Sequence, residues 1–162
     1  MPRGSRSVHQ TLINRFLKLN GKEVTEVHHI RPTKGFEVEE VKISGKTVKL
    51  WDLSGEVSYR GIWKNYLSDC DVAFVLIDGT ETSPEQLEAL KAVFAKIDFG
   101  LVKRLAVLIT KRDAEGFNSL PVIDFLRREK IYERLWNVET ISVRDADLHT
   151  KMQLLVQQLL KK

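Results

Sequence analysis

The sequence predicts a single α/β domain whose sheet is mostly parallel, and two observations support that fold class. Residues 72–77 and 105–109 are nearly continuous apolar runs, which is typical of parallel strands that are covered on both faces. The segments between these runs carry apolar residues at helical spacing instead. Strands that alternate with helices predict a doubly wound sheet, whose ligands bind just outside the carboxyl ends of the strands.

Local patterns predict the other strands. Residues 36–53 predict one antiparallel hairpin around a turn at 44–46, because two β-rich segments flank a short turn that contains a glycine. A helix that carries Trp63 and Tyr66 is expected next, and a short strand at 138–142.

Capping and periodicity predict further helices. Ser83, followed by Pro84 and Glu85, is a typical helix start, and residues 121–126 predict a second one. The C-terminal stretch carries an amphipathic stripe. We interpret these stripes as core. Their members are Leu87, Leu90, Val93, Phe94 and Ile97, and at the C-terminus Leu148, Met152, Leu155, Val156, Leu159 and Leu160.

Composition narrows the function classes. The chain has 162 residues, enough for one domain with a proper core, and 43% of them are hydrophobic. A formal net charge of +4 is too mild and too evenly spread to predict a nucleic-acid partner. Cys70 is the single cysteine, which excludes an internal disulfide and a cysteine zinc site. With no signal peptide or membrane-span pattern, we expect a cytoplasmic protein.

The most informative motif is Asp52-Leu53-Ser54-Gly55, at the end of the predicted hairpin. In nucleotide switches such an aspartate holds Mg²⁺ through water, and the glycine offers its backbone N–H to the terminal phosphate. One Asp-x-x-Gly is also compatible with an ordinary strand end and turn. Its companions must therefore decide between the two interpretations.

Those companions follow the later strands. Lys111 and Asp113 come directly after residues 105–109, and are similar to the Asn-Lys-x-Asp base-reading motif of small GTPases, with Thr110 in place of the Asn. In that motif the aspartate accepts hydrogen bonds from guanine and the lysine stem lies over the ring. Ser142 and Val143 occupy the place of the segment whose backbone N–H contacts the guanine oxygen. In isolation, Lys111 and Asp113 would more often form a charged loop than a base-reading site.

Together with Pro32-Thr33-Lys34-Gly35-Phe36, these motifs resemble those of the Arf and Arf-like small GTPases, from about Leu12 to the C-terminus. The resemblance implies the three-layer P-loop NTPase fold of small GTPases and binding of GTP or GDP with Mg²⁺. It implies that Thr33 ligates the metal. Residues 60–66 and 113–116 look most like the cilium-associated Arf-like sub-branch, which adds ciliary or endomembrane association and intracellular trafficking as expectations.

The chain departs from the family at the phosphate loop. Residues 1–11 are a degenerate version of that loop or an unrelated tail, with Thr11 at the hydroxyl that ligates Mg²⁺ and Gln10 or His9 at the lysine position. The family's first strand is apparently missing. Three alternatives would each explain the missing strand: a truncated reading frame, an artificial boundary of the chain, or a degenerate family member.

The predicted nucleotide site unites residues from every motif. Its members are Thr11, Thr33, Asp52, Gly55, Lys111, Asp113, Ser142 and Val143, of which Thr11, Thr33 and Asp52 would bind Mg²⁺. Glu56 stands where the family has the glutamine that positions the attacking water, so we expect GTP hydrolysis to be slow or absent.

The retained and the altered family motifs together leave two possible functions. One is a guanine-nucleotide-dependent switch that recruits protein effectors. The alternative is a pseudo-GTPase, an interaction scaffold without nucleotide. In both cases we expect a monomer, and any association with membranes would occur through its protein partners. Effectors are expected on the face carrying the four aromatic residues Phe36, Trp51, Trp63 and Tyr66, although these residues are also compatible with a core.

Overall fold

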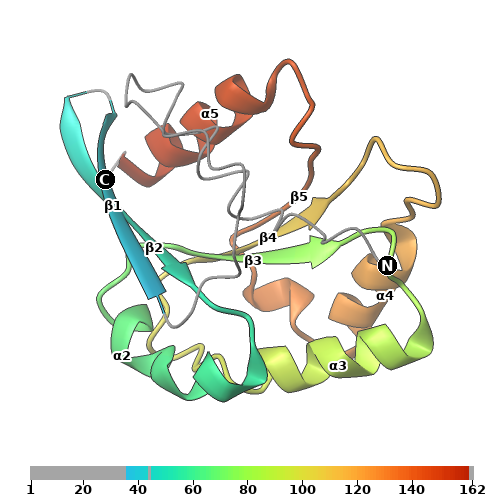
Figure 1. Ribbon diagram of the computed structural model, residues 1–162. Coiled ribbons are helices and arrows are strands. Elements are labelled where there is room, and N and C mark those ends of the chain that lie inside the picture. Colours follow the sequence, from blue (N-terminus) through green and yellow to red (C-terminus); the bar gives the residue numbers. More distant parts are fainter. Residues whose placement is uncertain (1–35, 44, 161–162) are drawn as a thin grey trace, which may run out of the picture. The chain divides into compact units, whose positions relative to one another are not determined.

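The computed structural model describes residues 36–43 and 45–160 (Figure 1). The chain divides into two compact units, one formed by residues 1–60 with 146–162 and the other by residues 61–145. The predictions for the phosphate loop, for Thr11, for Thr33 and for the missing first strand concern residues outside the described part.

The first unit contains the predicted antiparallel hairpin. Strand β1 (Phe36–Ile43) pairs with β2 (Lys46–Leu53), in a register that sets Val38 opposite Trp51. Gly45 in the turn has a φ of 76°, a left-handed conformation that glycine adopts without steric cost. The hairpin prediction is therefore confirmed.

The C-terminal helix of the same unit is also present. Helix α5 (Leu148–Leu160) buries Leu148, Met152 and Leu155, whose spacing of three and four residues places them on one face. Lys151 forms an ion pair of 3.2 Å with Asp147, one turn earlier. The predicted amphipathic stripe is thus confirmed for these three residues.

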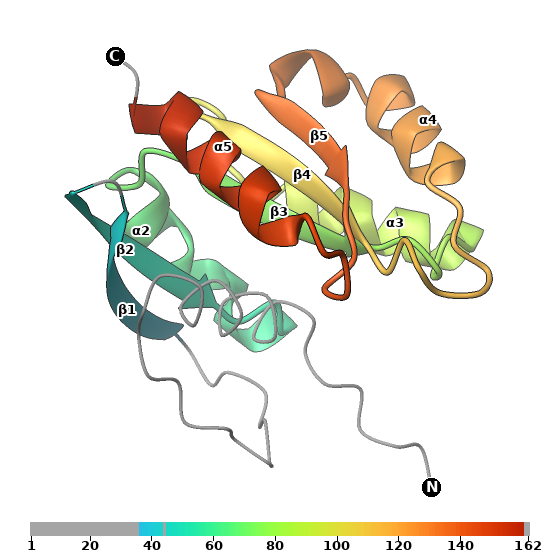
Figure 2. The ribbon, with the colours of Figure 1, turned by 90° about the horizontal axis from the view of Figure 1, so that it is seen from above.

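The second unit is built on a parallel sheet. Strands β3 (Ala73–Asp78), β4 (Leu105–Thr110) and β5 (Asn137–Thr140) lie in the order β3-β4-β5 (Figure 2). β5 ends two residues before the predicted boundary. In the described part of the chain, the hairpin and the parallel strands form two separate sheets.

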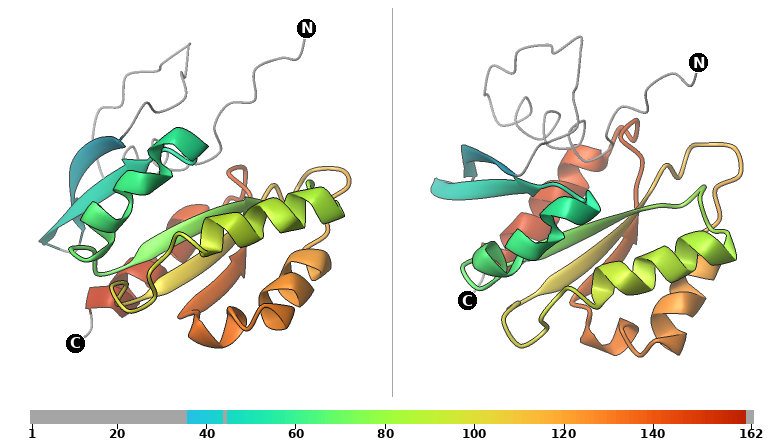
Figure 3. Two further views of the ribbon diagram at one scale, coloured as in Figure 1. Left: turned by 90° about the horizontal axis from the view of Figure 1, so that it is seen from below. Right: turned by 60° about the horizontal axis from the view of Figure 1, so that its bottom comes forward.

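Two helices cover one face of the parallel sheet (Figure 3). Helix α3 (Pro84–Phe94) begins as predicted, since the Ser83 side chain accepts a hydrogen bond from the backbone N–H of Gln86. Helix α4 (Leu120–Arg128) has Pro121 in its first turn and is followed by the short 3₁₀ helix η2 (Tyr132–Arg134). None of the described helices has the length and apolarity needed to cross a membrane.

The core of the second unit lies between this face of the sheet and the helices. Along β4, Val107 and Ile109 point into the core with Ile77 of β3, as the alternation of a strand requires. Phe94 of α3 and Phe125 of α4 meet there with ring centroids 6.5 Å apart. All six residues of β4 are buried, which confirms the interpretation of residues 105–109 as a fully covered strand.

The helical segment predicted to carry Trp63 and Tyr66 is present, in two short pieces. The segment forms a 3₁₀ helix, η1 (Val57–Ile62), and then only one turn of α-helix, α2 (Lys64–Leu67). Gly61 and the β-branched Val57 disfavour a continuous α-helix. Tertiary contacts anchor the second part, because Leu67 is buried and Trp63 packs against the core of the second unit.

Candidate functional site: a candidate nucleotide-binding site

Two polar loops follow the carboxyl ends of β4 and β5, where a doubly wound sheet binds its ligands. Residues 111–119 form the first loop and residues 142–145 the second. Backbone hydrogen bonds join the two loops where they leave the strands. The N–H of Arg112 donates to the carbonyl of Ile141 at 3.1 Å, and the N–H of Ile141 donates to the carbonyl of Ile109 at 2.8 Å. The sheet therefore brings together the two sequence motifs, which lie far apart along the chain.

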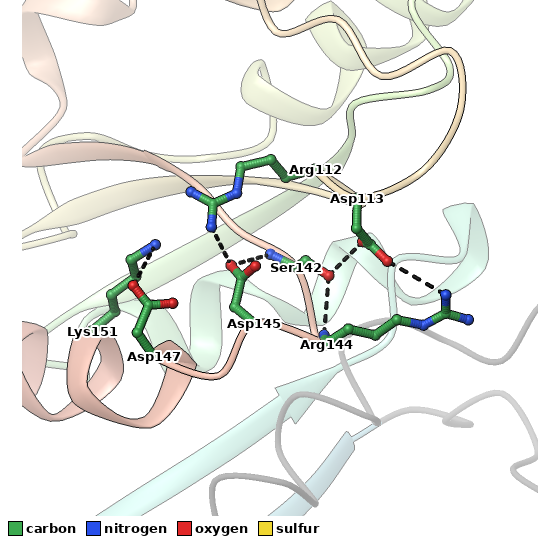
Figure 4. Close-up of polar contacts among 7 residues, drawn as sticks. All are labelled: Arg112, Asp113, Ser142, Arg144, Asp145, Asp147 and Lys151. Atoms are coloured by element: carbon green, nitrogen blue, oxygen red, sulfur yellow. Dashed lines mark hydrogen bonds and ion pairs between the residues drawn. The ribbon is translucent and has the colours of Figure 1, made fainter.

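Asp113 lies at the centre of the contact between the loops (Figure 4). The hydroxyl of Ser142 donates to its Oδ1 atom, and Nη1 of Arg144 lies 3.6 Å from its Oδ2 atom. The hydrogen bond from Ser142 lowers the pKa of the Asp113 carboxyl, and the positive charge of Arg144 acts in the same direction. Asp113 is therefore an ionised acceptor at neutral pH.

Val143 offers a backbone donor beside that acceptor. Its neighbours are bonded inside the loop, because the N–H of Ser142 donates to Oδ2 of Asp145 at 2.9 Å and that of Arg144 to the Ser142 hydroxyl at 3.0 Å. The N–H of Val143 has no acceptor among the residues that the structure describes. A carboxylate acceptor and a backbone donor thus stand on adjacent loops.

Lys111 is held at the root of the first loop. It has a positive φ of 63°, and its ammonium group forms an ion pair with Oδ2 of Asp78, at the end of β3. The backbone N–H and hydroxyl of Thr80 donate to the other carboxylate oxygen at 2.9 and 2.7 Å. Burial raises the pKa of Asp78, but the hydrogen bonds from Lys111 and Thr80 outweigh it and leave the pKa below its usual value.

Thr110 is turned away from this site. Its side chain is buried, and its hydroxyl donates to the carbonyl of Ile77 on the neighbouring strand at 3.2 Å. The residue that replaces the motif's asparagine therefore ties β4 to β3. It contributes no polar group to the loops.

The other predicted ligands belong to the first unit. Asp52, near the end of β2, is buried, whereas Gly55 is exposed and has open space where a side chain would be. The carbonyl of Gly55 accepts a hydrogen bond of 3.0 Å from Nε of Arg60, and Glu56 is exposed. Open space beside a glycine allows a ligand to approach the backbone closely.

The aromatic residues predicted to bind effectors fall into two groups. Phe36 and Trp51, on the hairpin, are 45% and 38% exposed, and their ring centroids lie 5.9 Å apart. Val38, opposite Trp51 in the register, is 40% exposed. The second group lies in the second unit, where Trp63 packs against the core, as its alternative interpretation predicted, and Tyr66 is half-buried.

A comparison with protein-family models matches residues 10–159 to the ADP-ribosylation factor family. The chain belongs to this Arf family. The match covers nearly the whole sequence, which confirms the resemblance drawn from its motifs. The sub-branch stays a prediction.

Individual relatives agree with this assignment. The chain is 28% identical over 119 residues to ADP-ribosylation factor-like protein 5A of Bos taurus, and 27% identical to the protein of that name from Homo sapiens. In both comparisons the match covers 72% of this chain and spans 66% of the relative's length.

A solved structure supports the fold. The Arl6 (BBS3) small GTPase of Trypanosoma brucei, determined with the bound nucleotide analogue GppNp, matches with a TM-score of 0.71. The match covers 94% of this chain and 90% of that structure at 17% identity. The predicted small-GTPase-like α/β fold is therefore confirmed.

Sequence reasoning found the Arf-family motif positions of the loops but missed their internal connections. Arg112 and Asp145 join the two loops by an ion pair of 2.8 Å, and Asp78 holds Lys111. These contacts join residues more than thirty positions apart, and no local pattern in the sequence indicates them.

Proposed function

We propose that this Arf-family chain binds guanine nucleotides, with the base between the loops 111–119 and 142–145. The observation that carries the proposal is the position of Asp113, whose ionised carboxylate is oriented by Ser142 next to the available N–H of Val143. This pair supplies an acceptor and a donor at the carboxyl ends of two parallel strands.

Guanine matches that pair chemically. Its N1–H and 2-amino groups are donors that a carboxylate such as Asp113 accepts, and its O6 atom accepts the N–H of Val143. Adenine has a donor where guanine has O6, so both contacts would be lost together. An unpaired polar group at a binding site costs more than a missing contact, which favours selection of guanine.

The phosphates and Mg²⁺ would be held by the predicted switch residues. Asp52 supplies a carboxylate, Gly55 a backbone N–H in open space, and Thr11 and Thr33 the hydroxyls that the family resemblance implies. Mg²⁺, when bound, would neutralise phosphate charge. Glu56 would bring a negative charge toward the phosphates instead of orienting water, so hydrolysis would be slow or absent.

The exposed hairpin aromatics support effector recruitment. Phe36, Val38 and Trp51 form an apolar surface of strands β1 and β2, and such surfaces often mark protein-protein contacts. We therefore infer a cytoplasmic switch that acts as a monomer on protein effectors, with any ciliary or endomembrane association provided by those partners.

Two observations favour the pseudo-GTPase scaffold as a second candidate. The ammonium group of Lys111 is already paired with Asp78, and the hydroxyl of Thr110 donates its hydrogen bond to Ile77 of β3. A chain that lacks the phosphate-loop lysine would also lose charge-assisted hydrogen bonds of about 1.5–3 kcal/mol each. Affinity for nucleotide would then be many orders of magnitude below that of a tight switch.

The test is a titration of nucleotide-stripped protein with a fluorescent GTP analogue, with and without Mg²⁺. We expect saturable binding that guanine nucleotides displace and adenine nucleotides do not. Asp113→Ala and Lys111→Ala should weaken it by about ten-fold or more, since each removes a charged partner of the ligand.

A matched control is Lys103→Ala, which removes an exposed lysine paired with Asp71 at the other end of the sheet. It should bind like the unmodified protein. If a protein that unfolds cooperatively shows no binding at millimolar ligand, the switch is excluded for this chain and the scaffold is favoured.

A further inference from the structure

An ion pair between Arg112 and Asp145 joins the two base-site loops, in addition to the hydrogen bond from Ser142 to Asp113 (Figure 4). Nη2 of Arg112 lies 2.8 Å from Oδ2 of Asp145, and the residues are 33 positions apart. The same Oδ2 atom accepts the backbone N–H of Ser142 at 2.9 Å. One oxygen therefore receives a donor from each loop.

Burial distinguishes this pair from an ordinary surface ion pair. The side chain of Asp145 is only 14% exposed, whereas that of Arg112 is 39% exposed. A partly buried carboxylate is screened less by solvent, so its attraction to the guanidinium group is stronger than at a fully exposed site. The pair therefore constrains the distance between the loops more than a fully exposed pair would.

The two constrained segments carry the base-contacting groups directly. Asp113 follows Arg112 in the chain, and Val143 follows Ser142. The bonded N–H groups of Ser142 and Arg144 fix the backbone on both sides of Val143. The Arg112–Asp145 contact therefore constrains the two segments that carry the carboxylate acceptor and the N–H donor, together with the hydrogen bond from Ser142 to Asp113.

We propose that Arg112 and Asp145 are positioning residues for base recognition, which set the spacing between the Asp113 carboxylate and the Val143 N–H. This inference rests on the proposed guanine-nucleotide binding. Neither residue contacts the base; each acts through the loop residue next to it. Loss of this ion pair should therefore lower the selectivity for the base strongly and the stability of the fold only weakly.

The test uses the full chain and compares GDP with IDP, the diphosphate of inosine, which lacks the 2-amino group of guanine. Asp145→Asn keeps the size of the side chain and removes its charge, and Arg112→Gln replaces the guanidinium group by a shorter, neutral polar side chain. We expect each to weaken GDP binding by about ten-fold or more and to lower the GDP-to-IDP affinity ratio. Arg112→Lys should restore part of both quantities.

The matched control is the ion pair between Lys103 and Asp71, which has a contact of 2.9 Å and joins residues 32 positions apart at the opposite end of the sheet. Lys103→Gln should change neither the GDP affinity nor the ratio. A loss in Lys103→Gln equal to that in Arg112→Gln would overturn the inference.

The outcomes separate the two proposals. If the unmodified protein does not bind GDP, the proposed function fails and the inference fails with it. If it binds GDP, and Asp145→Asn binds with the same affinity and ratio, only the positioning role is overturned. A lower melting temperature and weaker binding of both nucleotides at an unchanged ratio would show a purely structural ion pair, which also overturns it.

Discussion

The ring of Phe117 covers the backbone of Gly79 directly. A β-carbon at position 79 would lie 2.4 Å from Cε2 and 2.6 Å from Cδ2 of Phe117, well inside van der Waals contact. It would also lie 3.0 Å from Cγ2 of Ile109. The adjacent Asn118 donates its N–H to the carbonyl of Gly79 at 2.9 Å. The loop that carries Asp113 is therefore held against the end of β3 by a glycine that leaves room for an aromatic ring.

Gly79→Ala should consequently destabilise the protein. The added methyl group must displace the Phe117 ring and crowd Ile109, and overpacking of this kind costs about 1–3 kcal/mol. Urea unfolding would measure the change in the free energy of unfolding. Gly61→Ala is the matched control, because nothing lies within 4 Å of its β-carbon position. Equal stability of the two variants would contradict the packing argument.

The stabilising effect of Asp78 should depend on pH. Because the folded state lowers the pKa of Asp78, its ion pair with Lys111 stabilises the fold above the pKa of the unfolded chain, about 3.9, and is lost as pH falls through the folded value. Asp78→Asn should therefore cost about 0.5 kcal/mol at pH 7, a value discounted for partial exposure.

The measurement is urea unfolding of both proteins across the acid range. The difference between the unmodified protein and Asp78→Asn should shrink as pH falls from about 4, the pKa in the unfolded chain, to the lowered pKa of the folded state, below which both side chains are neutral. A difference that stays constant down to the acid limit would show that the charge of Asp78 contributes nothing.

Thr110→Val should separate a structural hydroxyl from a ligand-binding one. The variant removes the buried hydrogen bond to Ile77 and should lower the free energy of unfolding by about 1 kcal/mol. Nucleotide affinity should not change, because the hydroxyl points into the sheet. Thr47→Val on the exposed part of β2 is the stability control. A specific loss of nucleotide binding by Thr110→Val would assign the hydroxyl to the site.

Glu56→Gln should raise the rate of GTP hydrolysis if the proposed switch is correct. The exposed glutamate lacks the amide that orients water in the family, and its negative charge opposes the approach of hydroxide-like oxygen to phosphate. We expect an increase of about ten-fold in single-turnover phosphate release, which corresponds to about 1.4 kcal/mol in the barrier. Glu115→Gln provides a control of the same chemical change in the loop after β4. An unchanged rate would remove position 56 from the hydrolysis step.

Local patterns predicted most of the second unit correctly. The apolar run at 105–109 predicted a strand covered on both faces, and all six residues of β4 are buried. Ser83 and Pro84 predicted the start of α3, since a cap and a proline act within one turn of the helix. At 57–67 the sequence predicted a helix but not its division into two short pieces, whose residues Trp63 and Leu67 reach the core.

The sequence by itself determined the family, the order of strands and helices, and the chemical type of the groups at Asp113, Ser142 and Val143. These properties depend on local composition and on motifs a few residues long. Only the tertiary structure decided that Thr110 serves the sheet, that Asp78 holds Lys111, and that Arg112 and Asp145 join the loops. Each of these contacts closes a long loop of chain, and its geometry exists only once parallel strands bring their carboxyl ends together.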